Sequence, residues 1–349
     1  MQTARHFIIG DIHGCFDELM MLTRKMGLTA DDMLISLGDI VDRGNKSKEV
    51  YHYFSNRPRS VVLMGNHERK HLNGVLNYAQ DIVKLQLGPE YPAFLEWSAQ
   101  LPYYYETPEA IIVHAAMEDG VPLSAQREDV LCGATAGEKY LEKKYPEGTY
   151  WSDHYTGEKP VIYGHHVVGD QIKIANNTYG IDTGCCHGGY LTAIELPGFI
   201  VHQVKCETDY WKTAQKEWQV PVLQARDWAD MDFTAIRRQL DKLAYIEEPA
   251  ARQYLDQLHH GLGRLEALFP VLKEKLDAFA ARLLENGREV FSREANSYPF
   301  KTYLFKSSNH NLKVEDLQKS LLTPQKINQL AAALGVAPVE FPPFINTVR

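Results

Sequence analysis

The segment VVLMGNHERK at residues 61–70 joins a run of apolar residues to a polar turn. The apolar residues 61–64 include β-branched side chains and stop at Gly65, which predicts a buried strand that ends in a turn. Asn66, His67 and Glu68 follow directly and offer an amide oxygen, an imidazole and a carboxylate. Alone, this short match is also compatible with an ordinary loop, so its meaning depends on the rest of the chain.

Two earlier segments repeat the same arrangement. FIIGDIHG at residues 7–14 and LISLGDIVDRG at residues 34–44 each consist of an apolar run, a glycine and then acidic or imidazole side chains. Side chains that follow the carboxyl ends of parallel strands converge on one crevice of an α/β sheet. We therefore expect the three turns to contribute to a single site.

The order of elements around these turns predicts an α/β (α+β) domain over residues 1–220. Amphipathic helices are expected at residues 15–26 and 47–55, between strands at 7–9, 34–37 and 61–64, which implies parallel pairing with right-handed crossovers. Further strands are expected at residues 111–113, 161–163, 178–182, 190–196 and 199–204. Residues 117–159 are polar and irregular, and we interpret them as an insertion that borders the site.

The composition changes after Pro221, and residues 221–349 read as a mainly helical extension. Residues 232–285 show helical periodicity, which Pro249 and Pro270 are expected to divide into three helices. A shorter helix is expected after Pro324. This part has no clustered metal ligands, and packing, regulation, self-association or contact with a protein partner are all open roles for it.

Composition and charge restrict the function classes. The 349 residues are 44% hydrophobic and 23% charged, as in a globular protein, and the net charge of −8 argues against nucleic acid or an anionic membrane as a partner. An anionic substrate stays possible because bound metal ions outweigh the average surface charge. Five cysteines without framework spacing indicate a reducing compartment, and with no long apolar segment we expect a soluble, cytoplasmic protein.

The polar residues at the predicted strand ends form a set of metal-type ligands: Asp11, His13, Asp39, Asn66, His114 and His165. Their oxygen and imidazole donors suit Mn²⁺, Fe or Zn²⁺ better than Ca²⁺. Six ligands are too many for one zinc ion but fit two divalent metal ions that share a bridging carboxylate, with Mn²⁺ favoured. Such centres stabilise in-line displacement at phosphorus. Taken singly, each residue is also compatible with a capping or turn role.

These blocks resemble, in order, the signature of the calcineurin-like metallophosphoesterases. The matching blocks are GDIHG (10–14), GDIVDRG (38–44), GNHE (65–68), His114 and Gly164-His165. The second block resembles the branch that contains serine/threonine protein phosphatases and symmetric dinucleoside tetraphosphate hydrolases. DTGC at 182–185 and GGYLTA at 188–193 resemble its bacterial members and the phosphatase part of polynucleotide kinase-phosphatases. The resemblance implies a layered sandwich of two mixed β-sheets flanked by helices.

The resemblance also implies roles for individual residues. The first metal would be held by Asp11, His13 and Asp39, and the second by the bridging Asp39 with Asn66, His114 and His165. His67, oriented by Asp42, would donate a proton to the departing alkoxide, and Arg43 would bind the phosphoryl oxygens.

The chain departs from the family pattern in one respect. The family supplies a second phosphate-binding arginine from the insertion before the last histidine, whereas residues 151–164 contain only Lys159 as a cation. Our hypothesis is that Lys159 or Arg127 takes its place.

Four functions remain open on these grounds. The favoured one is a phosphomonoesterase, similar to the protein phosphatases, that acts on a phosphoprotein or a small phosphorylated compound. The nearest alternative is a symmetric dinucleoside polyphosphate hydrolase. A polynucleotide-end phosphatase ranks lower, because no kinase P-loop, ligase lysine motif or basic stripe accompanies the site. An inactive module that senses phosphate ranks lowest, because no predicted ligand is missing.

Overall fold

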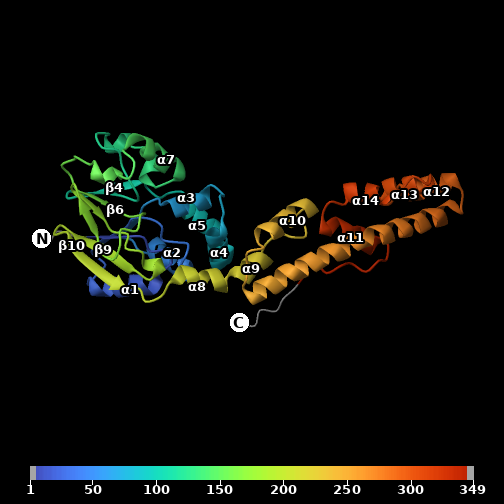
Figure 1. Ribbon diagram of the computed structural model, residues 1–349, viewed down its shortest axis with the longest axis horizontal. Helices are drawn as coiled ribbons and strands as arrows, with labels where there is room; N and C mark the ends of the chain where they lie inside the picture. Colours follow the sequence, from blue (N-terminus) through green and yellow to red (C-terminus); the bar gives the residue numbers. More distant parts are fainter. Residues whose placement is uncertain (1–4, 344–349) are drawn as a thin grey trace. The chain divides into compact units, whose positions relative to one another are not determined.

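The computed structural model describes residues 5–343, and the chain divides into two compact units between Trp218 and Gln219 (Figure 1). The first unit contains two five-stranded sheets. In spatial order, the first sheet consists of β10 (Ile200–Lys205), β9 (Tyr190–Leu196), β1 (His6–Ile9), β2 (Met33–Ser36) and β3 (Ser60–Val62). The second consists of β4 (Tyr104–Glu106), β5 (Ile111–Val113), β6 (Val161–Tyr163), β8 (Thr178–Gly180) and β7 (Lys173–Ala175).

Both sheets are mixed. β1, β2 and β3 are parallel neighbours, as are β5, β6 and β8, whereas β9, β10, β4 and β7 pair antiparallel at the sheet margins. The parallel strands place their carboxyl ends at one edge, which is where the ligand-bearing turns follow. The predicted pairing of the first three strands is therefore confirmed. β4 and β7 are strands that the sequence pattern did not predict.

The central strand β1 shows why its sequence is apolar throughout. Phe7, Ile8 and Ile9 are all fully buried. Ile8 packs between the two sheets with Ile35 and Ile162, while Phe7 and Ile9 pack against the helical layer on the other face. A strand buried on both faces needs no alternation of polar residues.

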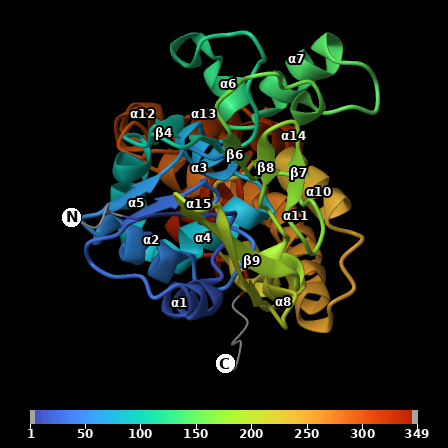
Figure 2. The same ribbon diagram turned by 90° about the vertical axis from the view of Figure 1, so that its left-hand side faces the viewer.

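Helices cover the outer faces of the two sheets (Figure 2). The first sheet is covered by α1 (Phe16–Lys25), α2 (Ser47–Ser55), α4 (Tyr78–Leu87) and α5 (Tyr91–Ser98). The outer face of the second sheet packs against α6 (Glu128–Leu131), α7 (Thr135–Lys144) and the buried Trp151. The expectation of an irregular insertion at 117–159 is therefore wrong in part, since Leu141 gives α7 a buried face. The unit is a sandwich of two mixed sheets flanked by helices, as predicted.

The second unit is helical, as predicted. Its helices are α9 (Gln219–Gln224), α10 (Phe233–Lys242), α11 (Pro249–Leu284), α12 (Arg288–Ala295), α13 (Lys301–Ser308), α14 (Val314–Ser320) and α15 (Pro324–Ala333). α8 (Tyr210–Glu217) ends the first unit. Among the described residues, no helix is both long and apolar enough to cross a membrane.

The prediction of three helices over residues 232–285 is wrong, because α11 continues through Pro270. A proline inside a helix removes one hydrogen bond and usually bends or ends the helix. Here Leu265, Phe269 and Leu272 bury one continuous face on both sides of the proline. This packing stabilises α11 at the position where Pro270 removes a hydrogen bond.

Candidate functional site

The loops that follow the parallel strands have an unusual backbone. Among the residues other than glycine with positive φ are five predicted site residues, namely His13, Asp39, Asp42, Arg43 and His165. Such angles are rare outside glycine, asparagine and aspartate, and they concentrate where function constrains the chain. Glycines allow the loops to approach closely, since a Cβ on Gly65 would lie 2.2 Å from Asp39 Oδ1. The residues with positive φ and the closely approaching loops therefore lie in the same cluster.

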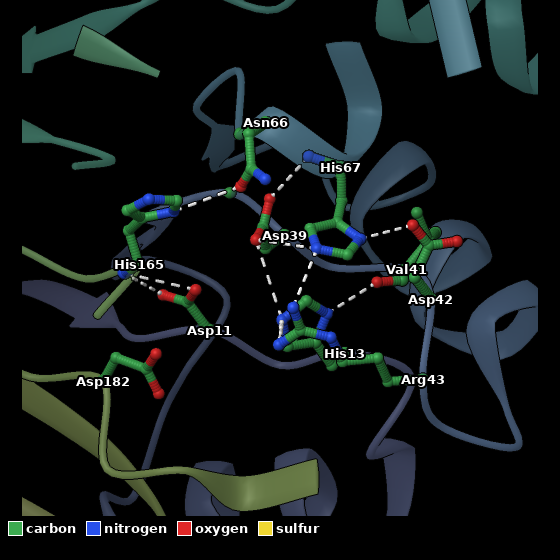
Figure 3. A network of polar contacts seen from close by, with 12 residues as sticks. Asp11, His13, Asp39, Val41, Asp42, Arg43, Asn66, His67, His165 and Asp182 are labelled. Carbon is green, nitrogen blue, oxygen red and sulfur yellow. Dashed lines mark hydrogen bonds and ion pairs between the residues drawn. The ribbon is translucent and has the colours of Figure 1, made fainter. Parts of the chain in front are cut away.

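Asp39 lies at the centre of that cluster (Figure 3). Its Oδ2 lies 3.6 Å from His13 Nε2, and its Oδ1 lies 3.5 Å from His114 Nε2. Asp39 is also the shared member of two groups of side chains, each with ligand atoms within 4.8 Å of one another: His13, Asp39 and His67, and Asp39, His114 and His165. Asp39 is 2% exposed, and although burial would raise its pKa, the surrounding imidazoles lower it. Its position between the two groups is that of a bridging carboxylate.

Main-chain carbonyls orient two of the imidazoles. His13 Nδ1 donates to the Val41 carbonyl and His114 Nδ1 donates to the Leu37 carbonyl, each over 2.9 Å. Both rings therefore present an unprotonated Nε2 to Asp39, which is the usual arrangement for metal-binding histidines. Burial lowers the pKa of His114 to about 4, so this ring is neutral at physiological pH.

Asn66, at the start of α3 (Asn66–Leu72), faces the remaining imidazole. Its Oδ1 lies 3.2 Å from His165 Nδ1 and 3.3 Å from His114 Nε2. Acceptors that face one another repel unless a cation lies between them. With its amide turned over, Asn66 instead donates to His165 Nδ1 and to Asp39 Oδ2 at 3.0 Å, and accepts from Lys70 at 3.3 Å. Lys70 is thus a cation beside the site that the sequence did not single out.

Two further carboxylates lie on the side of His165. Asp11 accepts from the His165 main-chain N–H over 3.1 Å, and Asp182, just beyond β8, lies on the same side of the site (Figure 3). Burial raises the pKa of both groups, and each is raised further by neighbouring carboxylates. The sequence pattern did not mark Asp182 as a site residue, although its position after a parallel strand was a usable signal.

The residues present fit two divalent cations. Carboxylate oxygens, an amide oxygen and unprotonated ring nitrogens converge on one buried region, and this mixture of donors suits Mn²⁺, Fe or Zn²⁺. A cation would also offset the mutual repulsion of Asp11, Asp39 and Asp182.

His67 also belongs to a second chain of polar contacts, which is centred on Asp42. Its Nδ1 lies 2.5 Å from Asp42 Oδ2, and the other carboxylate oxygen of Asp42 lies 3.0 Å from His71 Nε2. Gln80 also donates to Asp42, and His71 Nδ1 contacts the Tyr91 hydroxyl at 3.0 Å. Burial would raise the pKa of Asp42, but its hydrogen bonds to the two imidazoles lower it. A fully buried carboxylate thus fixes the orientation of the His67 ring.

Arg43 lies between the two halves of the site. Its guanidinium approaches His13 Nε2 and His67 Nε2, each at 3.1 Å. Because His13 Nε2 also faces Asp39, a metal bound at that nitrogen requires Arg43 to release it. The guanidinium would then be free to form other hydrogen bonds.

Glu68 has a structural role that the sequence did not reveal. Its carboxylate accepts from the main-chain N–H groups of Asp39 and Ile40, both over 2.9 Å, and from that of Gly65 over 3.2 Å. These contacts join the turns after β2 and β3. Glu68 therefore positions Asp39 rather than facing the cluster itself.

The structure does not support the proposed replacements for the missing arginine. Arg127 pairs with Asp129 over 2.8 Å at the surface, and its guanidinium lies 4.4 Å from the centre of the Tyr140 ring. Lys159 pairs with Glu106 over 2.8 Å. Both cations are engaged in other contacts, whereas Lys70 lies beside Asn66.

A pocket of about 400 Å³ adjoins the cluster, with His165 in its wall. Its other walls include Tyr145, Tyr150 and Trp151, together with Glu138 and Glu142 of α7. Glu138 accepts a hydrogen bond from His165 Nε2 over 2.9 Å. Aromatic side chains therefore form part of the wall of this cavity.

The fold and the clustered ligands define a metal-dependent phosphoesterase. The chain belongs to the calcineurin-like phosphoesterase family, whose pattern matches residues 4–233. It is 31% identical over 222 residues to the asymmetrical bis(5′-nucleosyl)-tetraphosphatase PrpE of Anoxybacillus flavithermus (strain DSM 21510 / WK1), an alignment covering 54% of this chain and 89% of the relative. A protein of the same name from Geobacillus sp. (strain WCH70) is 32% identical over 225 residues. This alignment covers 54% of this chain and 89% of the relative.

Solved structures of phosphoesterases are also similar. The metallophosphoesterase from Sphaerobacter thermophilus is 17% identical with a TM-score of 0.39, covering 61% of this chain and 93% of that one. A protein serine/threonine phosphatase from Saccharomyces cerevisiae is 15% identical with a TM-score of 0.42, covering 59% of this chain and 80% of that one.

Proposed function

We propose that this enzyme hydrolyses phosphoric esters or anhydrides with two divalent metal ions, Mn²⁺ being the favoured ion. The observation that carries the proposal is the position of Asp39 between His13 Nε2 and His114 Nε2, at 3.6 Å and 3.5 Å. Asp11, His13 and Asp39 would hold one ion, and Asp39 with Asn66, His114 and His165 would hold the other. Ions bound there would polarise a phosphoryl oxygen and lower the pKa of a coordinated water.

The remaining residues supply acid catalysis and orientation. Asp42 accepts a hydrogen bond from His67 Nδ1–H and orients the ring, so His67 Nε2 would be the atom that passes a proton to the departing oxygen. Arg43, released from the two imidazoles, would bind the phosphoryl group through its planar fork of donors. Glu68 keeps Asp39 in place throughout.

For the substrate class, we propose a dinucleoside polyphosphate. Two observations support this choice: the curated relatives are named as asymmetrical tetraphosphatases, and the pocket beside His165 offers aromatic walls to a nucleobase. The relatives' names also favour asymmetric cleavage, to a nucleoside monophosphate and a nucleoside triphosphate, over the symmetric cleavage that the motifs suggested.

A phosphomonoester, either a phosphoprotein or a small compound, is the second candidate. The dyad of His67 and Asp42 favours it, since a general acid contributes most when the leaving group is a poorly stabilised alkoxide.

One experiment separates the two. The protein is incubated with Mn²⁺ and either diadenosine tetraphosphate or a phosphoserine peptide, with Asp39→Asn as the inactive control. We expect higher kcat/KM for the dinucleotide, with AMP and ATP as the products, and loss of both activities in the control. Two molecules of ADP would replace the asymmetric proposal by the symmetric one, and preference for the peptide would replace the substrate class. A folded, metal-loaded protein without turnover would leave the phosphate-sensing module as the remaining function.

A further inference from the structure

Three cysteines and a glutamate meet in the helical layer of the first unit, outside the cluster around Asp39. Cys15 precedes α1, Glu18 lies in the first turn of α1, Cys185 begins a 3₁₀ turn after Gly184, and Cys206 follows β10. All four are buried, with exposed fractions of 0%, 5%, 1% and 0% respectively. Segments distant in sequence therefore bring four potential ligands to one place.

The geometry of the group is that of a small coordination site. Cys15 Sγ, Cys185 Sγ and a Glu18 carboxylate oxygen all lie within 4.8 Å of one another. Cys206 belongs to the same buried cluster of side chains as Cys15 and Cys185. None of these cysteines is in a disulfide.

The carboxylate of Glu18 is incompletely satisfied. Its Oε1 accepts from the Tyr210 hydroxyl over 3.2 Å, whereas its Oε2 is buried and makes no hydrogen bond. An unpaired buried carboxylate oxygen is costly, and it is uncommon in a well-packed interior. Here it lies among thiols, which are weak hydrogen-bond donors but strong ligands for soft cations.

We propose that Cys15, Glu18, Cys185 and Cys206 bind a structural Zn²⁺ ion. Three thiolates and a carboxylate give zinc a closed tetrahedral set with no position left for substrate. Mn²⁺ and Mg²⁺ prefer oxygen ligands, so this group selects a different ion from the cluster around Asp39.

Zinc binding requires the thiols to exchange their present partners for the ion. Cys15 Sγ–H now donates to the His13 carbonyl over 3.7 Å, and Cys206 Sγ–H to the Thr208 carbonyl over 3.1 Å. Both are weak hydrogen bonds, and the proton of each thiol leaves when the metal binds.

The site would hold two loops that carry active-site residues. Cys15 lies two residues after His13, and Cys185 lies three residues after Asp182. Zinc would therefore fix the start of α1 to the turn beyond β8. A disulfide between two of these cysteines would also join these segments, but it would leave Glu18 Oε2 without a partner.

Cobalt substitution tests the proposal directly. The full-length protein is stripped of metal under reducing conditions and titrated with Co²⁺, because thiolate ligands give a sulfur-to-cobalt charge-transfer band in the near ultraviolet. The predicted ligands around Asp39 include no cysteine, so the band reports this site alone. We expect a saturable band that is displaced by Zn²⁺, is lost in Cys185→Ser, and is retained in Asp39→Asn. Cys132→Ser is the matched control, since Cys132 is also buried but contacts Arg69 instead.

Metal analysis gives an independent readout. Protein purified without added metal should contain about one more equivalent of zinc than Glu18→Gln or Cys206→Ala, two milder variants that serve if Cys185→Ser fails to fold. Absence of the band in the wild-type protein, or equal zinc contents in all variants, would overturn the proposal. Thiols that resist alkylation until a reductant is added would replace the zinc site by a disulfide.

Discussion

His165 Nε2 donates a hydrogen bond to Glu138 Oε1 over 2.9 Å, so the ring nitrogen that faces Asn66 carries no proton. A carboxylate can only accept, and this fixes the neutral His165 ring in one tautomer. Glu138 comes from α7 in the region between β5 and β6, so a residue of this helix orients the His165 ring.

Replacing Glu138 should therefore weaken metal binding. We expect Glu138→Ala to raise the Mn²⁺ concentration for half-maximal activity by about 10–100-fold, because a carboxylate that accepts from one ring nitrogen orients the imidazole and makes its other nitrogen more basic. Glu142→Ala is the matched control, since Glu142 lines the same pocket on the same helix. The measurement is Mn²⁺ titration by calorimetry and by activity. Equal affinities in the two variants would remove this role.

His67 should matter most for substrates with poor leaving groups. A general acid contributes about 10²–10⁴-fold, so His67→Asn should lower kcat for an alkyl phosphate by about that factor. The loss should be smaller for para-nitrophenyl phosphate, whose leaving group needs less protonation. Comparing both substrates under saturating Mn²⁺ checks this, with metal content as the control. An equal loss for both would indicate that His67 orients the site instead of donating a proton.

Arg43 should not be replaceable by lysine. Its guanidinium contacts two imidazoles at once, and a bidentate contact with phosphoryl oxygens needs the same planar fork. We expect Arg43→Lys and Arg43→Ala to lower kcat/KM by similar factors, of order 10²-fold, with little change in thermal stability. Near wild-type kinetics in the lysine variant would show that charge alone suffices.

The sequence predicted the polar turns after the parallel strands because their geometry is local. An apolar strand that ends in glycine and then aspartate or asparagine specifies both the strand end and the polar side chain beyond it, as at Asp11, Asp39 and Asn66. The family resemblance supplied the two-sheet architecture. Both depend on short-range patterns, and the structure contains the elements they predict.

The residues that sequence reasoning missed act over long distances in the chain. Glu138 reaches His165 only because Leu141 buries α7, and Glu68 joins two turns through main-chain groups that carry no sequence signal. The predicted helix end at Pro270 was wrong for a related reason, because tertiary packing outweighed the local tendency of proline to end a helix. These outcomes depend on packing, which the order of residues alone does not reveal.

A substitution in the core of the helical unit should lower the free energy of unfolding without lowering kcat. Leu265 is fully buried in the core around α11, so Leu265→Ala should cost about 2–5 kcal/mol of the free energy of unfolding. Below the unfolding temperature, we expect kcat for para-nitrophenyl phosphate to stay within about twofold of wild type, since catalysis uses residues of the first unit. Denaturant unfolding and kinetics check both statements. A large loss of kcat in the folded variant would instead assign the helical unit a catalytic role.

Glu18 should give the metal-free protein a distinctive pH dependence. Burial, with Cys206 adding to it, raises the pKa of Glu18 to about 7 from its ordinary value of 4.5. A carboxyl group that binds its proton more tightly when folded stabilises the protein fully below pH 4.5, and this stabilisation is lost as the pH rises through about 7.

Glu18→Gln removes that ionisation, so the variant isolates its effect. In the presence of a chelator, its stability relative to the wild-type protein should increase between pH 4.5 and about 7 and then level off, by at most about 3 kcal/mol. Denaturant unfolding of both proteins at several pH values gives the difference between their free energies of unfolding. Asp39 and Asp42 ionise in both proteins, so their contributions cancel in this difference. If the difference is independent of pH, Glu18 has a normal pKa, and its buried oxygen has a partner in solution. If instead the difference reverses when Zn²⁺ is supplied, the ionised carboxylate is the form that binds the metal.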